Sequence, residues 1–96
     1  MLHMVRGEIR ALLSPTMIRR ARELAGINQA RLASLAGITR KTVMAVEASL
    51  PEKPDARRRA VLEKIRWVFE QGFELEFTFG SGTEGDGVRK KSKSVN

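Results

Sequence analysis

The chain has 96 residues, of which 42% are hydrophobic, and its 18 basic and 11 acidic side chains give a formal net charge of +7. This length allows one domain with a modest core, but it is too short for an enzyme with a deep pocket. There is no cysteine, which excludes a disulfide framework and a thiolate zinc site, and no apolar run approaches the ~20 residues of a membrane span.

Positive charge is most concentrated over residues 15–48, where six basic and two acidic side chains leave a net charge of +4. This excess favours a polyanionic partner, with nucleic acid the leading candidate; the alternative is a basic surface that serves solubility. The N-terminus lacks the apolar region of a signal peptide, so we expect a cytoplasmic protein and no membrane partner.

Residues 1–14 form an N-terminal extension, in which the helical spacing of Ile9, Leu12 and Leu13 predicts a short helix over 8–13. His3 is the only histidine of the chain and has no neighbour of the metal-ligand type. We therefore expect no metal ion here, and no cofactor elsewhere.

The next helix is predicted over 15–25, because Ser14 can cap its start and Pro15 suits the first helical position. Its predicted inward stripe consists of Ile18, Ala21, Leu24 and Ala25, and its predicted solvent-facing residues are Arg19, Arg20 and Glu23. Gly26 ends the helix, and Asn28 can cap the one that follows.

Two short helices with a tight turn are predicted over 29–36 and 40–48. Leu32, Ala33 and Ala36 share one face of the first helix, and Val43 and Val46 share one face of the second. Gly37 can take the left-handed conformation that the turn needs, and the Thr39 hydroxyl can accept a backbone N–H at the start of the second helix. This arrangement is typical of a DNA-binding helix-turn-helix, and the alternative is an αα-hairpin of a helical adaptor that does not bind DNA.

The prolines of 50–54 indicate a loop, after which a helix is predicted over 55–71, ending at Gly72. Its apolar stripe consists of Val61, Leu62, Ile65, Val68 and Phe69. Trp67 falls one position off this stripe, which suits either the edge of the core or a contact with a second copy.

Apolar and polar residues alternate over 73–79, which predicts a half-buried strand, and the glycine-rich loop after it favours a second strand at 88–90. Because an isolated two-stranded hairpin is marginal in water, we expect the strand over 73–79 to pair with its copy in a second chain. Residues 92–96 are expected to form a disordered basic tail.

The pattern Gln-x-x-Leu-Ala-x-x-x-Gly-Ile-Thr-x-x-x-Val-x-x-Val-Glu at 29–47 resembles the Cro/phage-repressor (XRE-type) helix-turn-helix family. With its flanking helices, the resemblance covers about 15–72. It implies a mainly α fold, a compact four- to five-helix Cro/repressor-like helix-turn-helix domain over 15–72 followed by a C-terminal strand or hairpin over 73–91. It also implies a nucleoid-associated protein of bacterial or phage origin that binds double-stranded DNA.

In such a domain the helix over 40–48 enters the major groove. Arg40 suits a bidentate contact to guanine, Lys41 suits a base or a phosphate, and Met44 and Ala45 suit a thymine methyl group. Both of the last two depart from the polar residues of many family members, which implies weaker hydrogen-bonded readout. The candidates for phosphate or groove-edge contacts are Gln29, Thr39 and Thr42.

The resemblance further implies an ion pair between Arg22 and Glu47 that closes the recognition helix; the alternative is a solvated Arg22. The chain has no catalytic constellation, so we expect a binding protein and not an enzyme. The leading hypothesis is a homodimeric, sequence-specific transcriptional regulator, most simply a repressor. The alternative is an antitoxin or protein-interaction module that binds a partner such as a toxin and uses its helix-turn-helix to autoregulate its own operon.

Overall fold

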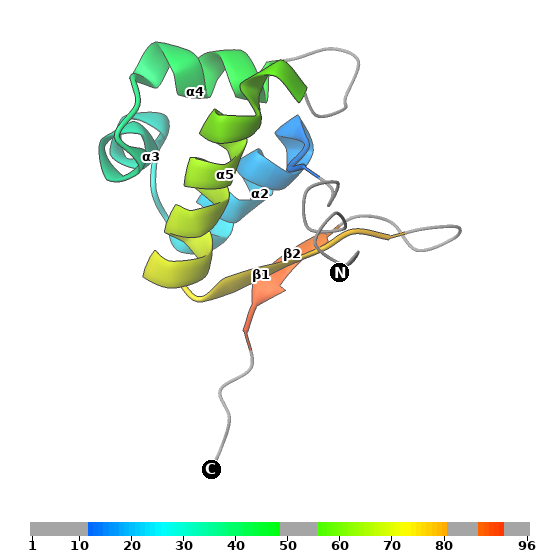
Figure 1. Ribbon diagram of the computed structural model, residues 1–96. Helices are drawn as coiled ribbons and strands as arrows, with labels where there is room; N and C mark the ends of the chain where they lie inside the picture. The colour runs from blue at the N-terminus through cyan, green and yellow to red at the C-terminus, as the bar shows by residue number, and fades with distance from the viewer. Residues whose placement is uncertain (1–11, 49–55, 81–86, 92–96) are drawn as a thin grey trace, which may run out of the picture.

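The computed structural model describes residues 12–48, 56–80 and 87–91, and the predictions that fall on 1–11, 49–55, 81–86 and 92–96 lie outside the described residues. The described part is mainly helical, with one small antiparallel sheet (Figure 1). Its elements in chain order are α2 (Pro15–Ala25), α3 (Gln29–Ala36), α4 (Arg40–Glu47), the 3₁₀ turn η1 (Ala56–Arg58), α5 (Arg59–Trp67), the π-helical turn η2 (Val68–Gly72), β1 (Leu75–Thr78) and β2 (Gly87–Lys90).

The helices occupy one end of the molecule and the hairpin occupies the other (Figure 1). α3 and α4 contact each other, α2 contacts both α4 and β2, and α5 contacts α3. In Figure 1, α4 therefore lies at the end of the molecule opposite the sheet. No helix in the described ranges is long and apolar enough to cross a membrane.

Local capping sets the starts of α2 and α3 where the sequence predicts them. The Ser14 hydroxyl accepts a hydrogen bond from the Met17 backbone N–H at 3.2 Å, and the Asn28 side chain accepts one from the Arg31 backbone N–H at 2.8 Å. Gly26 ends α2 in the left-handed conformation, with φ = 72°. These caps satisfy backbone groups that a helix end leaves without an intrahelical partner.

The core lies between the helices and the inner face of the hairpin, and α2, α3, α4, α5, η2 and β1 all contribute fully or nearly fully buried apolar side chains. Its members are Leu13, Met17, Ile18, Ala21, Leu32, Ala33, Val43, Val46, Leu62, Ile65, Val68, Phe69, Leu75 and Phe77. The hairpin is thus part of the same core as the helices.

Two details of α2 differ from the prediction. Leu24 was expected to face inward, but it is 39% exposed. At about 100° per residue it lies roughly 120° round the helix from Ile18, in the last turn of α2. Met17 and Leu13 are buried instead, and residues 12–14 are not helical, so the described end of the predicted helix over 8–13 is an irregular segment that packs its leucine in the core.

The predicted single helix over 55–71 is divided into η1, α5 and η2. In the π-helical turn η2 both Val68 and Phe69 are buried, and the Phe73 N–H closes the turn with a hydrogen bond to the Phe69 carbonyl at 3.2 Å. Gly72 ends the turn without a positive φ; the left-handed residue is Glu74, at φ = 55°. Glu74 thus makes the reversal that leads into β1.

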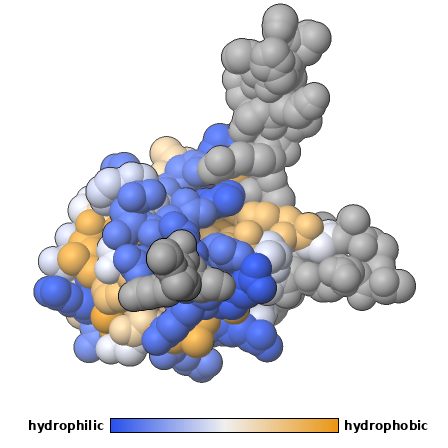
Figure 2. All heavy atoms as spheres, turned by 90° about the horizontal axis from the view of Figure 1, so that it is seen from below, coloured by the Kyte–Doolittle hydropathy of each residue, from blue (hydrophilic) through white to orange (hydrophobic). Residues whose placement is uncertain are grey.

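The prediction that the strand pairs with a second chain was based on the weakness of an isolated hairpin, and the structure removes that reason. β1 pairs with β2 of the same chain, with Glu76 opposite Arg89 and Phe77 opposite Val88. Leu75 and Phe77 face the core, while Glu76 and Arg89 form an ion pair at 2.6 Å on the outer face. Seen from the sheet side, the coloured surface of this end of the molecule is largely hydrophilic, with separate hydrophobic patches (Figure 2).

Candidate functional site

The turn between α3 and α4 holds these two helices in a fixed relation. Gly37 is left-handed, with φ = 71°, and the Ile38 N–H donates to the Ala33 carbonyl at 3.0 Å, which closes the end of α3. The Thr39 hydroxyl then accepts from the Thr42 N–H at 3.1 Å at the start of α4. The connection between the helices is therefore short and capped on both sides, as the sequence predicts.

α4 has two distinct faces. Val43 is fully buried and Val46 is 4% exposed, so one face belongs to the core. Arg40, Lys41 and Met44 are exposed on the opposite face. The outward face of α4 therefore presents two cations and a flexible thioether side chain to solvent.

Glu47, the last residue of α4, is 5% exposed and is the centre of a polar cluster. Arg22 on α2 approaches its carboxylate with two nitrogens, with Nε 2.7 Å from Oε2 and Nη2 2.9 Å from Oε1. Gln29, the first residue of α3, donates from Nε2 to Oε1 at 3.1 Å. Three helices thus meet at one buried carboxylate.

Two further contacts complete the cluster. Arg22 Nη1 donates to the Ile27 carbonyl at 3.3 Å, which ties it to the segment between α2 and α3. Arg19 donates from Nη1 to the backbone carbonyl of Glu47, at the end of α4 where carbonyls lack intrahelical partners. The hydrogen bond from Arg22 to Glu47 raises the pKa of the Arg22 guanidinium, with burial acting in the opposite direction.

The predicted ion pair between Arg22 and Glu47 is confirmed. Sequence reasoning missed Arg19, which was expected to face water. The one available signal was its spacing, because residues three apart on a helix lie on the same face and Arg19 stands three positions before Arg22.

The candidate contact residues lie on α3, on α4 or in the short turn between them, at the end of the molecule that these two helices form (Figure 1). Gln29 is engaged with Glu47, and the hydroxyls of Thr39 and Thr42 share a hydrogen bond of 3.0 Å. Ala45 is half-buried, unlike its exposed neighbour Met44. The predicted roles of these residues toward a phosphate or a base stay predictions.

A polar hollow lies next to this cluster, lined by Arg22, Asn28, Gln29, Ala30 and Arg40. It connects the start of α3 with the start of α4, which are the ends where helical backbone N–H groups and the helix dipole favour negative charge. The two helices carry three cations, Arg31, Arg40 and Lys41, against the single acid Glu47, which is paired. This surface can hold an anionic group.

Comparison with protein-family models gives no match, and neither does comparison with curated protein sequences.

Proposed function

We propose that this protein is a sequence-specific DNA-binding regulator of transcription, most simply a repressor, of the Cro/phage-repressor (XRE-type) helix-turn-helix class. It acts in the cytoplasm on bacterial or phage DNA, as a homodimer, with α4 in the major groove. The observation that carries the proposal is the build of α4. It is a short helix, held at both ends by the rest of the fold, whose outward face is formed by Arg40, Lys41 and Met44.

The fixed ends of α4 matter because reading bases requires side chains at defined positions. A bidentate arginine–guanine contact contributes about 1–3 kcal/mol of discrimination only when the guanidinium meets the base edge in the correct geometry. Thr39 caps the start of α4, and the cluster around Glu47 holds its end on α2 and α3. A rigid helix of this kind favours DNA reading over an adaptor role, in which partner helices can adjust to each other.

The charge of the surrounding surface agrees with the proposal. Arg31 on α3 and Arg40 and Lys41 on α4 are exposed, and the polar hollow beside Arg40 suits a backbone phosphate. The N-terminal segment that would discriminate between a regulator and an antitoxin lies within 1–11, outside the described residues. No contact among the described residues favours the antitoxin alternative.

Selection of bound duplexes from a random-sequence pool tests the proposal. We expect the protein to select one preferred sequence, and Arg40→Ala to relax the preference at one position of each half-site. Lys91→Ala is the matched control, because Lys91 is an exposed cation next to β2 at the opposite end of the molecule and its loss changes the net charge equally. If the selected pool remains random in sequence, the protein is not a sequence-specific regulator.

A further inference from the structure

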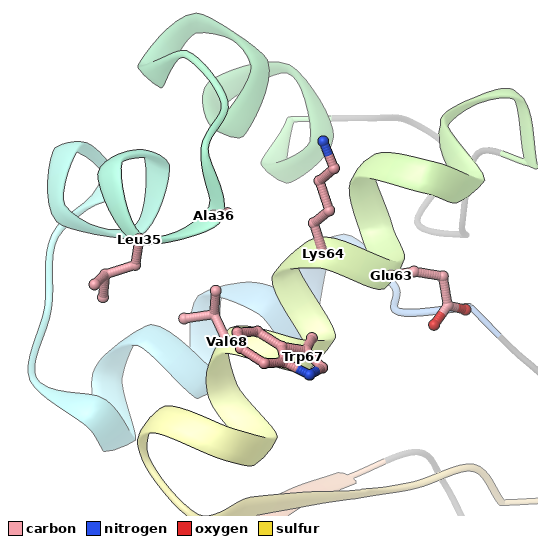
Figure 3. Close-up of a pocket in the computed structure, with 6 residues that line it drawn as sticks. All are labelled: Leu35, Ala36, Glu63, Lys64, Trp67 and Val68. Carbon is pink, nitrogen blue, oxygen red and sulfur yellow. The ribbon is translucent and has the colours of Figure 1, made fainter.

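One apolar surface of the molecule has no role in the proposed contact with DNA. It is an open groove between α3 and α5, lined by Leu35, Ala36, Glu63, Lys64, Trp67 and Val68. None of these residues belongs to α4, so a partner seated in the groove leaves Arg40, Lys41 and Met44 uncovered. Figure 3 shows Val68, the first residue of η2, pointing toward Leu35 on α3, with the ring of Trp67 from the end of α5 beside them.

The exposure of Trp67 is the most informative feature of this groove. Its side chain is 63% exposed, and Leu35 on the opposite wall is 40% exposed. Val68, by contrast, is 5% exposed and forms the floor. A large exposed aromatic beside an apolar hollow is the usual composition of an interaction surface, since tryptophan is enriched among the residues that dominate binding energy.

The charge around the groove selects the kind of partner. The whole chain carries a net charge of +7, so two copies repel each other over most of their surface. At the groove, Glu63 and Lys64 are adjacent and of opposite sign, and they point to opposite sides of α5 (Figure 3). Ala60, one turn before Lys64 on α5, and Gln71, in η2, are exposed and uncharged. An acidic partner gains little at such a face, whereas a second copy of this chain meets little repulsion there.

The shape of the groove also fits a two-fold contact, in which the same patch must supply both the protruding group and the hollow that receives it. Trp67 is the protruding group, and the wall and floor formed by Leu35, Ala36 and Val68 are the hollow. A stable interface buries roughly 1,200–2,000 Å² in total, of which one tryptophan supplies about 150–250 Å² per copy. Trp67 alone therefore does not make a stable interface, and a two-fold contact centred on the groove requires further contacts along α3 and α5.

We infer that this groove is the surface through which two copies of the chain associate, with Trp67 of each copy seated against Leu35 of the other. The inference rests on the proposed function in one respect: a single short recognition helix makes few base contacts, and two half-sites about one helical turn apart are needed for specific binding. It gives the dimer a surface other than β1, one edge of which pairs with β2.

Sedimentation equilibrium of the full chain without DNA, over a concentration series, tests this inference. Trp67 is the only tryptophan, so quenching of its fluorescence by acrylamide reports its exposure in the same samples. We expect a monomer–dimer equilibrium, with quenching that falls as the dimer forms. Trp67→Ala should raise the dissociation constant by about tenfold or more, the effect of losing a residue that dominates an interface.

Leu24→Ala is the matched control, because Leu24 is an exposed leucine on α2 outside the groove, and it should leave the dissociation constant unchanged. Leu35→Ser, on the other wall, should weaken the dimer as Trp67→Ala does. A monomer at every concentration overturns the inference and leaves the groove to a different partner. A dimer that leaves Trp67 quenching and both groove variants unaffected also overturns it.

These outcomes are distinguishable from a failure of the proposed function. Self-association is measured without DNA, and Arg40→Ala should leave it unchanged. Trp67→Ala should keep the base preference of each half-site while weakening binding to a site with two of them. A dimer that selects no sequence therefore supports the groove and contradicts only the DNA-binding proposal.

Discussion

Glu47 is a carboxylate in a place where an unpaired charge is costly, since its residue is 5% exposed. Arg22 compensates this cost with two short contacts, and Gln29 supplies a third hydrogen bond. The pair does more than stabilise, because it joins α2 and α3 to the end of α4. The geometry of the outward face of α4 therefore depends on Glu47, which is itself buried.

Removing Arg22 should strand the Glu47 carboxylate. We expect Arg22→Ala to lower the free energy of unfolding by about 3 kcal/mol, the typical cost of breaking a buried pair by losing one partner. Urea denaturation measures it. Arg20→Ala is the control, since Arg20 is an exposed arginine of the same helix and its loss should change stability by about 0.5 kcal/mol or less.

A double-mutant cycle separates the free-energy cost of leaving the Glu47 charge unpaired from the cost of lost packing. On a Glu47→Gln background no charge is left to strand, so Arg22→Ala should cost clearly less than in the natural chain. Equal costs on both backgrounds would show that the pair contributes nothing beyond its packing. Because the pKa of Arg22 is raised, the contribution of its charge is present below the ordinary arginine pKa and is lost only as pH rises through the raised value; it is constant around neutral pH.

The sequence predicted correctly the roles of those residues that act on close neighbours in the chain. Ser14, Asn28 and Thr39 cap the helices that follow them, because a cap acts across three positions. The contact from Arg19 to the Glu47 carbonyl spans 28 positions, so it depends on where α4 ends in space. The prediction for Leu24 was wrong for a geometric reason, since Leu24 lies roughly 120° round α2 from Ile18 in the last turn of the helix and is 39% exposed.

At the scale of elements, the turn between α3 and α4 depends on the backbone conformation of Gly37. A Cβ added there meets no atom within 4 Å, so space is not the constraint. The positive φ is the constraint, because an L side chain in the left-handed region costs about 1–2 kcal/mol.

We therefore expect Gly37→Ala to lower the free energy of unfolding by about 1 kcal/mol, as measured by thermal or urea denaturation. Gly72→Ala is the matched control: an added Cβ is also free of contacts, but φ is not positive. It should be neutral or stabilise by about 0.4–1 kcal/mol, because it restricts the unfolded chain. Equal effects of the two substitutions would contradict a left-handed turn at Gly37.

The hairpin should behave as part of the core, since Leu75 is fully buried. We expect Leu75→Ala to lower the free energy of unfolding by about 2–5 kcal/mol, the usual cost of truncating a core leucine. Thr78→Ala, at an exposed position of the same strand, should change it by about 0.5 kcal/mol or less. A small effect of Leu75→Ala would mean that the hairpin is not packed on the helices, and pairing of β1 with a second chain would again be open.

The element boundaries were predictable where the sequence contains helix-capping residues or helix-breaking glycine and proline. α2 and α3 match the predicted 15–25 and 29–36, and α4 ends one residue before the predicted 40–48. The division of the last helix into η1, α5 and η2 was not predictable, because residues 56–71 contain neither glycine nor proline. The left-handed conformation of Glu74 was equally hidden, since glutamate gives no signal for it.

At the scale of the whole molecule, the proposed DNA surface and the hairpin lie at opposite ends (Figure 1). Basic side chains occur at both ends: Arg40 and Lys41 on α4, and Lys90 and Lys91 at the hairpin. Net charge alone therefore does not favour one end for the proposed contact with DNA. Within the described residues, the end with α4 combines cations with a helix fixed at both termini.

The salt dependence of binding distinguishes the two ends. If Lys41 contacts a phosphate, Lys41→Ala should make the slope of log K against log salt shallower by about 0.9 per lost contact in each copy. Fluorescence anisotropy of a labelled duplex at several salt concentrations measures the slope. Lys91→Ala removes the same charge from the other end, and its slope should equal that of the natural chain.

The central claim, that α4 reads base sequence, is tested most directly by one ratio: the affinity for the selected duplex divided by the affinity for a scrambled duplex at fixed salt. In the natural chain we expect a ratio of about 10³ or more, as in specific DNA-binding proteins. Arg40→Ala should reduce this ratio by a factor equivalent to about 1–3 kcal/mol of binding free energy per half-site. Lys91→Ala should leave the ratio unchanged. A ratio near one in the natural chain, or a large ratio that Arg40→Ala does not alter, would contradict the assignment of α4 as the recognition helix.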